Sequence, residues 1–242
     1  MCRMVGVVSK GPFHSEVLED LRQVSETGKV PGWKRLGHRD GWGIATFDNG
    51  SPVYLGRSPL WVAHDDSLAG AVERASALAP PSFLVAHVRA ASRGKATLPN
   101  THPFIVDGLI LAHNGTIRGF VTTASRKPMG ETDSERLALV VADRYEEMHD
   151  LPSALKSVVR EEVFPRKFTG AVLLATDGKV MCGYRDFSEN GGYYDLRTAA
   201  TPDRVVLFQE TYGGIEGVVS QVKRRELVSI GPDLGMKRET IR

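Results

Sequence analysis

The sequence predicts a layered α+β fold rather than a sheet wound from βαβ units. Two observations predict it: valine-rich, strand-like segments stand near both ends of the 242 residues, and helical patterns are grouped between them. The length fits one domain, or one domain with a small appendage. We expect a single domain over residues 2–242.

The N-terminal half mixes strand and helix patterns. Its expected elements are a strand at 3–9, a helix at 15–27, strands at 43–48 and 52–57, a helix at 66–78 and a strand at 82–88. The first strand begins almost at the terminus, so we expect the chain's first residues to be built into a sheet. Gly28 ends the first helical pattern, and Asn49-Gly50 predicts a hairpin turn between two strands.

The rest of the chain, from residue 108 on, contains the longest predicted helix and most of the later strands. Its expected elements are a strand at 108–114, helices at 132–149 and 152–162, and strands at 168–176, 179–185, 204–209 and 226–230. Glu135 follows Thr132 by three residues, which predicts a capping box at the start of the long helix. The polar segment 91–105 is expected to be a loop between two buried strands.

Composition excludes several classes of function. The formal charge of +2 is too near balance to indicate a nucleic-acid partner, and clusters such as Lys223, Arg224 and Arg225 are expected to be solvated surface. No apolar stretch is long enough for a membrane span and no signal peptide is visible, so we expect a cytoplasmic protein. The two cysteines and unpaired histidines predict no metal site, and no cofactor is expected.

Cys2 is the strongest single indication of chemistry. Only two cysteines occur in the chain, and one of them becomes the first residue if Met1 is removed. A terminal cysteine carries its own base, because a free α-amine titrates at about 7.7 to 8.0 beside a thiol that titrates at about 8.5. The alternative is an inert small residue at a frayed end.

Asn114-Gly115 follows an apolar strand and has two interpretations. By itself the pair favours a hairpin turn in which both residues adopt positive φ. In a catalytic interpretation, the Asn114 amide and the Gly115 backbone N–H form an oxyanion hole.

Other polar residues are candidates for binding a substrate. Arg89 follows a buried strand, where it is either a structural ion-pair partner or a clamp on a substrate carboxylate. Asp133 lies in the first turn of a helix, which stabilises a carboxylate without any function, but it could also bind a substrate ammonium. His38, Asp40, Trp42 and His102 lie beside turns and either line the pocket or pack the fold.

Taken in order, Cys2, HRDGWGIA (38–45), HVRAAS (87–92), THPF (101–104), AHNGTI (112–117) and ETDSE (131–135) resemble the glutaminase domain of class II glutamine amidotransferases. The resemblance, closest to stand-alone members of this Ntn-hydrolase family, is good through about Glu135. It implies a four-layer αββα sandwich with mainly antiparallel sheets. It also implies Cys2 as nucleophile, Asn114 and Gly115 as oxyanion hole, and Arg89 and Asp133 as substrate clamps.

Three functions follow from that resemblance. The first is hydrolysis of the glutamine γ-carboxamide through a Cys2 thioester, with ammonia passed to an acceptor on a partner chain such as a synthetase, because this chain has no phosphate-binding loop. The second is hydrolysis of a larger γ-glutamyl amide or peptide, since Ala90 and Arg93 stand where the sugar-phosphate amidotransferases of the family have a tryptophan and a histidine. The third is a catalytically silent glutamine-binding regulatory module.

Overall fold

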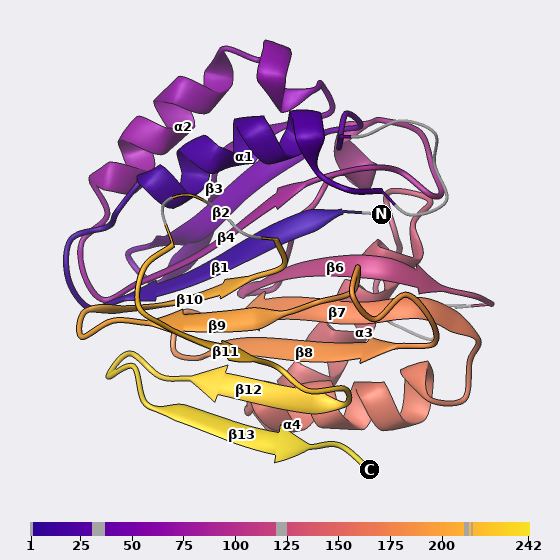
Figure 1. Ribbon diagram of the computed structural model, residues 1–242. Helices are drawn as coiled ribbons and strands as arrows, with labels where there is room; N and C mark the ends of the chain where they lie inside the picture. The colour runs from indigo at the N-terminus through magenta and orange to yellow at the C-terminus, as the bar shows by residue number, and fades with distance from the viewer. Residues whose placement is uncertain (1, 31–36, 120–124, 211–212, 214) are drawn as a thin grey trace.

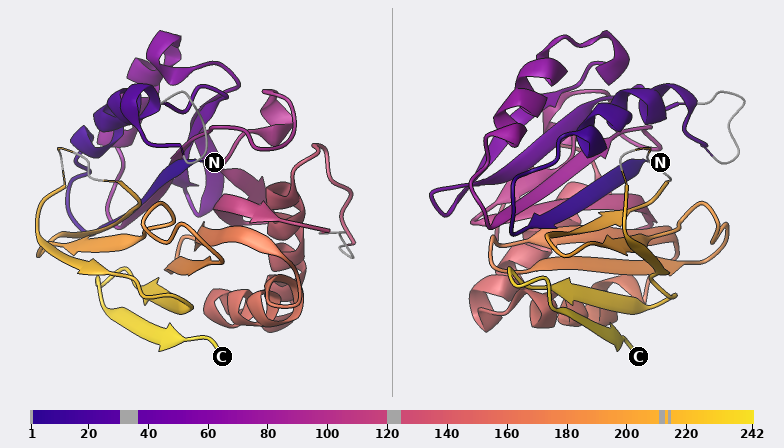
Figure 2. Two further views of the ribbon diagram at one scale, coloured as in Figure 1. Left: turned by 45° about the vertical axis from the view of Figure 1, so that its right-hand side comes forward. Right: turned by 60° about the vertical axis from the view of Figure 1, so that its left-hand side comes forward.

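Two antiparallel sheets face each other, and helices cover the outer face of each (Figure 1). The computed structural model describes residues 2–30, 37–119, 125–210, 213 and 215–242. Figure 2 shows from two further sides that α1 and α2 lie on one outer face and that α3 and α4 lie on the opposite one. The α+β class and the four-layer αββα arrangement predicted from the sequence are confirmed.

The first sheet has seven strands in the order β11-β9-β10-β1-β4-β2-β3. Its elements are β1 (Arg3–Ser9), β2 (Trp42–Asp48), β3 (Ser51–Ser58), β4 (Ser82–Val88), β9 (Arg197–Ala200), β10 (Arg204–Phe208) and β11 (Val218–Gln221), with α1 (Glu16–Thr27) and α2 (Ser67–Ser76) outside. Because β1 pairs with β4 on one side and β10 on the other, the first strand of the chain lies at the centre of this sheet.

The second sheet has six strands in the order β13-β12-β8-β7-β6-β5. Its elements are β5 (Phe104–Val106), β6 (Leu109–Ile117), β7 (Phe168–Thr176), β8 (Met181–Phe187), β12 (Glu226–Ile230) and β13 (Met236–Thr240), with α3 (Asp133–Met148) and α4 (Leu151–Val158) outside. A π-helical turn, Val159–Val163, extends α4. No helix among the described residues is long and apolar enough to cross a membrane.

The alternating faces of β1 explain its unbroken apolar sequence. Met4 and Val8 point into the layer between the two sheets, whereas Val5 and Val7 point toward α1 and α2. Every residue of β1 is buried, because both faces of the strand are covered. The start of this strand is therefore held rigidly, and it lies beside β6 of the opposing sheet.

Several local expectations were wrong. The predicted strand at 108–114 continues to Ile117, so Asn114-Gly115 lies inside β6 rather than in a hairpin turn. β5 interrupts the predicted loop at 91–105, and β9, β11 and β13 were missed. The last two are fully exposed and carry little apolar pattern. Arg224 and Arg225 are not simply solvated, since both form ion pairs with the fully buried Asp186.

The long helix begins as predicted, although only half of its capping box forms. The Thr132 hydroxyl accepts a hydrogen bond from the Glu135 backbone N–H at 3.2 Å. The Glu135 carboxylate turns instead to the backbone N–H groups of Met129 and Gly130, each at 2.7 Å. It therefore fixes the segment that precedes the helix.

Candidate active site

The main chain of Cys2 is paired with the side chain of Asn114. The Cys2 backbone nitrogen donates to Asn114 Oδ1 at 3.0 Å, and Asn114 Nδ2 donates to the Cys2 carbonyl at 2.8 Å. Both residues are buried, and they join β1 of one sheet to β6 of the other. A residue at the end of a chain is thus held at two points. Met1 lies outside the described residues, so its removal stays a prediction.

Two further donors hold the Cys2 carbonyl. Arg3 Nη1 donates to it at 3.0 Å, and the Tyr193 hydroxyl donates at 3.3 Å. Burial raises the pKa of Tyr193, which keeps its hydroxyl protonated. The Arg3 guanidinium lies 4.0 Å from the centre of the Tyr193 ring, and Glu210 pairs with Arg3 Nε at 2.5 Å. Chain ends commonly fray, and these contacts oppose fraying here.

Gln209 determines which way the Asn114 amide faces. Gln209 Nε2 donates to the carbonyl of Asp195 at 3.1 Å, which turns its oxygen toward Asn114 Nδ2 at 3.0 Å. With Nδ2 toward Gln209, Asn114 presents its oxygen to the Cys2 nitrogen. Both protons of Nδ2 are engaged, one by Cys2 and one by Gln209. Asn114 can donate to an oxyanion only by releasing one of them.

Gly115 sits where β6 bulges. Its φ is +148°, and the pairing of β6 with β7 shifts register between Gly115 and Ile117. A Cβ atom at this position would lie 1.7 Å from the carbonyl oxygen of Gly170. Only glycine fits, and the bulge brings Gly115 to the wall of a small pocket.

That pocket contains the thiol-bearing Cys2. Its atom-free space, part of which is open to solvent, is about 300 Å³, and it is lined by Cys2, residues 89–93, His102, His113, Gly115 and residues 132–134. The structure therefore brings together five of the predicted site residues, which are Cys2, Arg89, His102, Gly115 and Asp133. Asn114 lies beside the pocket and contacts Cys2.

Arg89 lines the pocket, but its guanidinium is engaged by the loop that follows β4. Its Nη1 donates to the Lys95 carbonyl at 2.9 Å, and its Nη2 donates to the Arg93 carbonyl at 2.7 Å. Burial lowers the pKa of Arg89, while the nearby Cys2 and Asp40 favour its charge. In this structure Arg89 holds the pocket wall, and a role as carboxylate clamp stays a prediction.

Asp40 and Asp133 both tie loops to the pocket. Asp40 Oδ2 accepts from the Ala91 backbone N–H at 2.8 Å, which fixes the wall formed by residues 90–92. Asp133 Oδ2 accepts from the Ile117 backbone N–H at 2.6 Å, which joins the start of α3 to the end of β6. One carboxylate oxygen of Asp133 therefore already accepts a hydrogen bond from within the chain.

The sequence did not indicate His113 or Ser134, which also line the pocket. His113 Nδ1 lies 2.9 Å from Ser134 Oγ, and its Nε2 lies 3.3 Å from the Gly170 carbonyl oxygen. The available signal was a histidine inside the apolar run LILAHNG. Nothing in the sequence indicated Gln209 or Tyr193, because their partners lie far away in the chain.

His102 is a buried side chain that faces the pocket. Its ring stacks on His87 with centroids 4.2 Å apart, and its edge meets Phe104. Burial, and then the neighbouring His87, lower the pKa of His102 well below its usual value. Among the described residues, neither of its ring nitrogens has a hydrogen-bond partner.

Two predicted substrate-binding residues do not line the pocket. Trp42 is fully buried in the core beneath α1 and α2, and its indole N–H donates to Asp65 at 2.9 Å. His38 is also fully buried, packed close to Gly28. Of the two alternatives stated for these residues, the structure places both side chains in packing positions.

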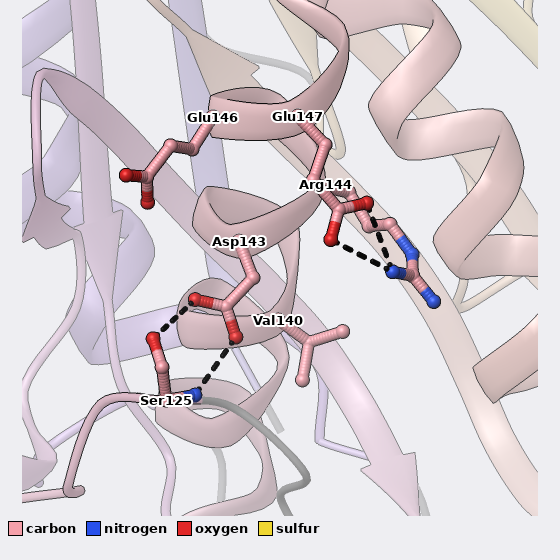
Figure 3. A pocket seen from close by; sticks show the side chains of 6 residues that line it. All are labelled: Ser125, Val140, Asp143, Arg144, Glu146 and Glu147. Atoms are coloured by element: carbon pink, nitrogen blue, oxygen red, sulfur yellow. Dashed lines mark hydrogen bonds and ion pairs between the residues drawn. The ribbon is translucent and has the colours of Figure 1, made fainter.

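A larger hollow lies on the outer face of α3 and offers different chemistry (Figure 3). Its atom-free space, part of which is open to solvent, is about 870 Å³, and it is lined by Ser125, Val140, Asp143, Arg144, Glu146 and Glu147. Ser125 bonds Asp143, and Arg144 pairs with Glu147 at 3.1 Å. Its described lining includes no cysteine or histidine, whereas Cys2, His102 and His113 line the smaller pocket. No cluster of metal-ligand type is found within the described ranges.

A family model described as "Glutamine amidotransferases class-II" matches residues 1–195. The chain belongs to this family. The match extends well beyond Glu135, where the recognisable motifs end. The resemblance stated from the sequence is confirmed, and it places the protein among amidotransferases whose nucleophile is an N-terminal cysteine.

Individual relatives agree with this assignment. YafJ of Escherichia coli, grouped by name with the glutamine amidotransferases, is 31% identical over 142 residues, which cover 56% of this chain and 52% of YafJ. The chain spans about half the length of the curated relatives that it matches first.

Solved structures share the fold. The glutamine phosphoribosylpyrophosphate amidotransferase of Bacillus subtilis aligns with a TM-score of 0.65 at 18% identity, over 100% of this chain and 49% of that one. A predicted glutamine amidotransferase from Pseudomonas aeruginosa aligns with a TM-score of 0.60 at 22% identity, over 96% and 98%. The sandwich is thus of the Ntn-hydrolase type.

Proposed function

We propose that this protein hydrolyses the γ-carboxamide of glutamine and that residues 2–242 act as one domain. The observation that carries the proposal is the two-point pairing of Cys2 with Asn114, which holds a thiol-bearing terminal residue at the wall of a small pocket. Family membership supports the same chemistry. The proposal requires that Met1 be removed, so that the α-amine of Cys2 is free.

In the proposed reaction, the α-amine takes the thiol proton and Cys2 Sγ attacks the amide carbon. The carbonyl oxygen becomes an oxyanion that accepts from the Gly115 N–H and from Asn114 Nδ2. Nδ2 can leave the Cys2 carbonyl without stranding it, because Arg3 and Tyr193 still donate there. The ammonium group returns its proton to the leaving nitrogen, ammonia departs, and water hydrolyses the γ-glutamyl thioester to glutamate.

Delivery of the ammonia to an acceptor on a partner chain is part of the proposal. It is supported by membership of the glutamine amidotransferase family. We also propose a cytoplasmic location, which fits two cysteines that are both free thiols.

Hydrolysis of a larger γ-glutamyl amide or peptide is the second candidate. The observation that favours it is that the pocket wall at Ala90, Ala91 and Ser92 is formed by small side chains. The relative rates for glutamine and a panel of γ-glutamyl amides decide between the two, since a wide preference for glutamine rejects the second.

The direct test is release of ammonia from glutamine by the purified protein, with Cys2→Ala as its control. Intact mass is measured on the same sample, because retained Met1 would block the α-amine. A processed protein that releases no ammonia from glutamine or any γ-glutamyl compound, alone or with candidate partners, would contradict the proposal and favour a silent binding module.

A further inference from the structure

The contact between His113 and Ser134 lies beside the pocket, and no step of the proposed reaction uses it. His113 is on β6 and Ser134 is in the first turn of α3, so the pair joins the second sheet to its covering helix. Both side chains are buried, and both line the pocket. The pair has a fixed hydrogen-bond direction, which follows from the third group that it contacts.

That third group is the carbonyl of Gly170, which can only accept. It lies 3.3 Å from His113 Nε2, so the ring carries its proton on Nε2. Burial lowers the pKa of His113 despite the opposing charge of Asp133, and the ring is therefore neutral near pH 7. Its Nδ1 is then a lone pair, and the Ser134 hydroxyl must donate to it across 2.9 Å.

Ser134 has one proton, and His113 takes it. Only lone pairs of Ser134 Oγ remain for any group in the pocket, so this serine accepts and does not donate. Its neighbour Asp133 is also an acceptor, but one oxygen of that carboxylate is already bonded to the Ile117 N–H. An ammonium group brings three N–H donors, which is more than the remaining oxygen of Asp133 would satisfy by itself.

We propose that Ser134, oriented by His113, is a specificity-determining residue that accepts a hydrogen bond from the free α-ammonium of the substrate. The pocket then selects γ-glutamyl compounds whose α-amine is unblocked. This inference rests on the proposed function, because it concerns the same pocket. It adds a second recognition group beside Asp133 and excludes substrates that present a carboxylate at this point.

The kinetic test compares glutamine with glutaramate, which is glutamine without its α-amino group. Wild type should prefer glutamine in kcat/KM, and Ser134→Ala should lower that preference by about 10- to 100-fold, as expected for a hydrogen bond to a charged donor. The matched control is Ser92→Ala, which removes another hydroxyl of the pocket wall, one that lies 2.9 Å from Thr116 Oγ1. In Ser92→Ala the ratio between the two substrates should stay as in wild type.

A binding test separates this inference from the proposed function. In the Cys2→Ala background, calorimetry gives the ratio of Kd values for glutamine and glutaramate with and without Ser134→Ala, and no turnover is needed. Ammonia release with an unchanged ratio in Ser134→Ala overturns the inference and leaves the function standing. The inference is also overturned if Ser92→Ala lowers the preference for glutamine over glutaramate as much as Ser134→Ala does. It is likewise overturned if the wild-type protein shows no preference between the two compounds. A wild-type protein that binds glutamine in preference to glutaramate but releases no ammonia would instead contradict the proposed function.

Discussion

The side-chain amide of Asn114 holds both main-chain polar groups of Cys2, although the two residues are 112 positions apart. The pairing joins β1 to β6, so that the two sheets meet at the pocket. It also assigns Asn114 two tasks in the proposed reaction, which are to hold the nucleophile at rest and to donate to the oxyanion. The predictions below test this arrangement.

Replacing Asn114 should affect turnover more than folding. In Asn114→Ala we expect kcat to fall by about 10²- to 10³-fold, as when one oxyanion donor is lost. The fold should persist, because the Cys2 carbonyl keeps Arg3 and Tyr193 as hydrogen-bond partners. Ammonia release from glutamine gives kcat, and thermal unfolding verifies the fold. Ordinary turnover in this variant would contradict the proposed role.

Gln209 should act on turnover through Asn114. In Gln209→Met we expect kcat to fall roughly tenfold with little change in KM, because an unsatisfied or reoriented amide costs about 1 to 3 kcal/mol. The control is Gln221→Met, since Gln221 also bonds Asp195, at 2.8 Å, but does not reach Asn114. Equal effects of the two substitutions on kcat would show that Gln209 acts only through Asp195.

Gly115→Ala should be strongly destabilising. The added Cβ would lie 1.7 Å from the Gly170 oxygen at a φ of +148°, so strand and backbone must both shift, at a cost of roughly 3 kcal/mol or more. Gly108→Ala is the matched control, because its φ is +85° but nothing lies within 4 Å. It should lose only about 1 kcal/mol. Denaturant unfolding measures both, and similar losses would argue against the clash.

Acidification should destabilise the fold through its buried histidines. Burial lowers the pKa of His38, His87, His102 and His113. As pH falls through about 6.5, the unfolded chain binds protons that the folded chain does not. The free energy of unfolding therefore decreases as the pH is lowered, until the pH reaches the pKa of the histidines in the folded state.

The effect should reach about 1.4 kcal/mol per pH unit for each such histidine. Urea unfolding at about pH 7.5 and about pH 5.5 measures it, and His102→Leu should show a shallower dependence than wild type by roughly one histidine's share. An identical slope in both proteins would mean that His102 binds protons equally in the folded and unfolded states, so that folding does not lower its pKa.

The two cysteines should differ in reactivity. Burial raises the pKa of Cys182 to about 12, so its thiolate is scarce at neutral pH. A glutamine-like electrophile followed by peptide mapping should therefore label Cys2 and leave Cys182 unmodified in the native protein. In denaturant both should react with iodoacetamide, and native labelling at Cys182 would contradict its assignment as a structural thiol.

Much of this architecture could be predicted from local patterns. The apolar spacing of α1 and α3 and the valine run of β1 depend on residues close together in the chain, and all three were placed correctly. β11 and β13 were missed, because edge strands with exposed side chains carry no apolar period. Asn114-Gly115 carries a sequence pattern typical of a turn, but both residues lie in a strand, because β6 pairs with β7 at this point.

The sequence by itself determined the family and the order of its motifs, because these depend on residue type and local spacing. Only the tertiary structure decided what each polar side chain bonds. It turned Trp42 into the core, engaged Arg89 with loop carbonyls, and brought Gln209 to Asn114 across 95 positions of chain. The physical reason is that a side chain's hydrogen bonds depend on neighbours in space, and those come from strands of both sheets.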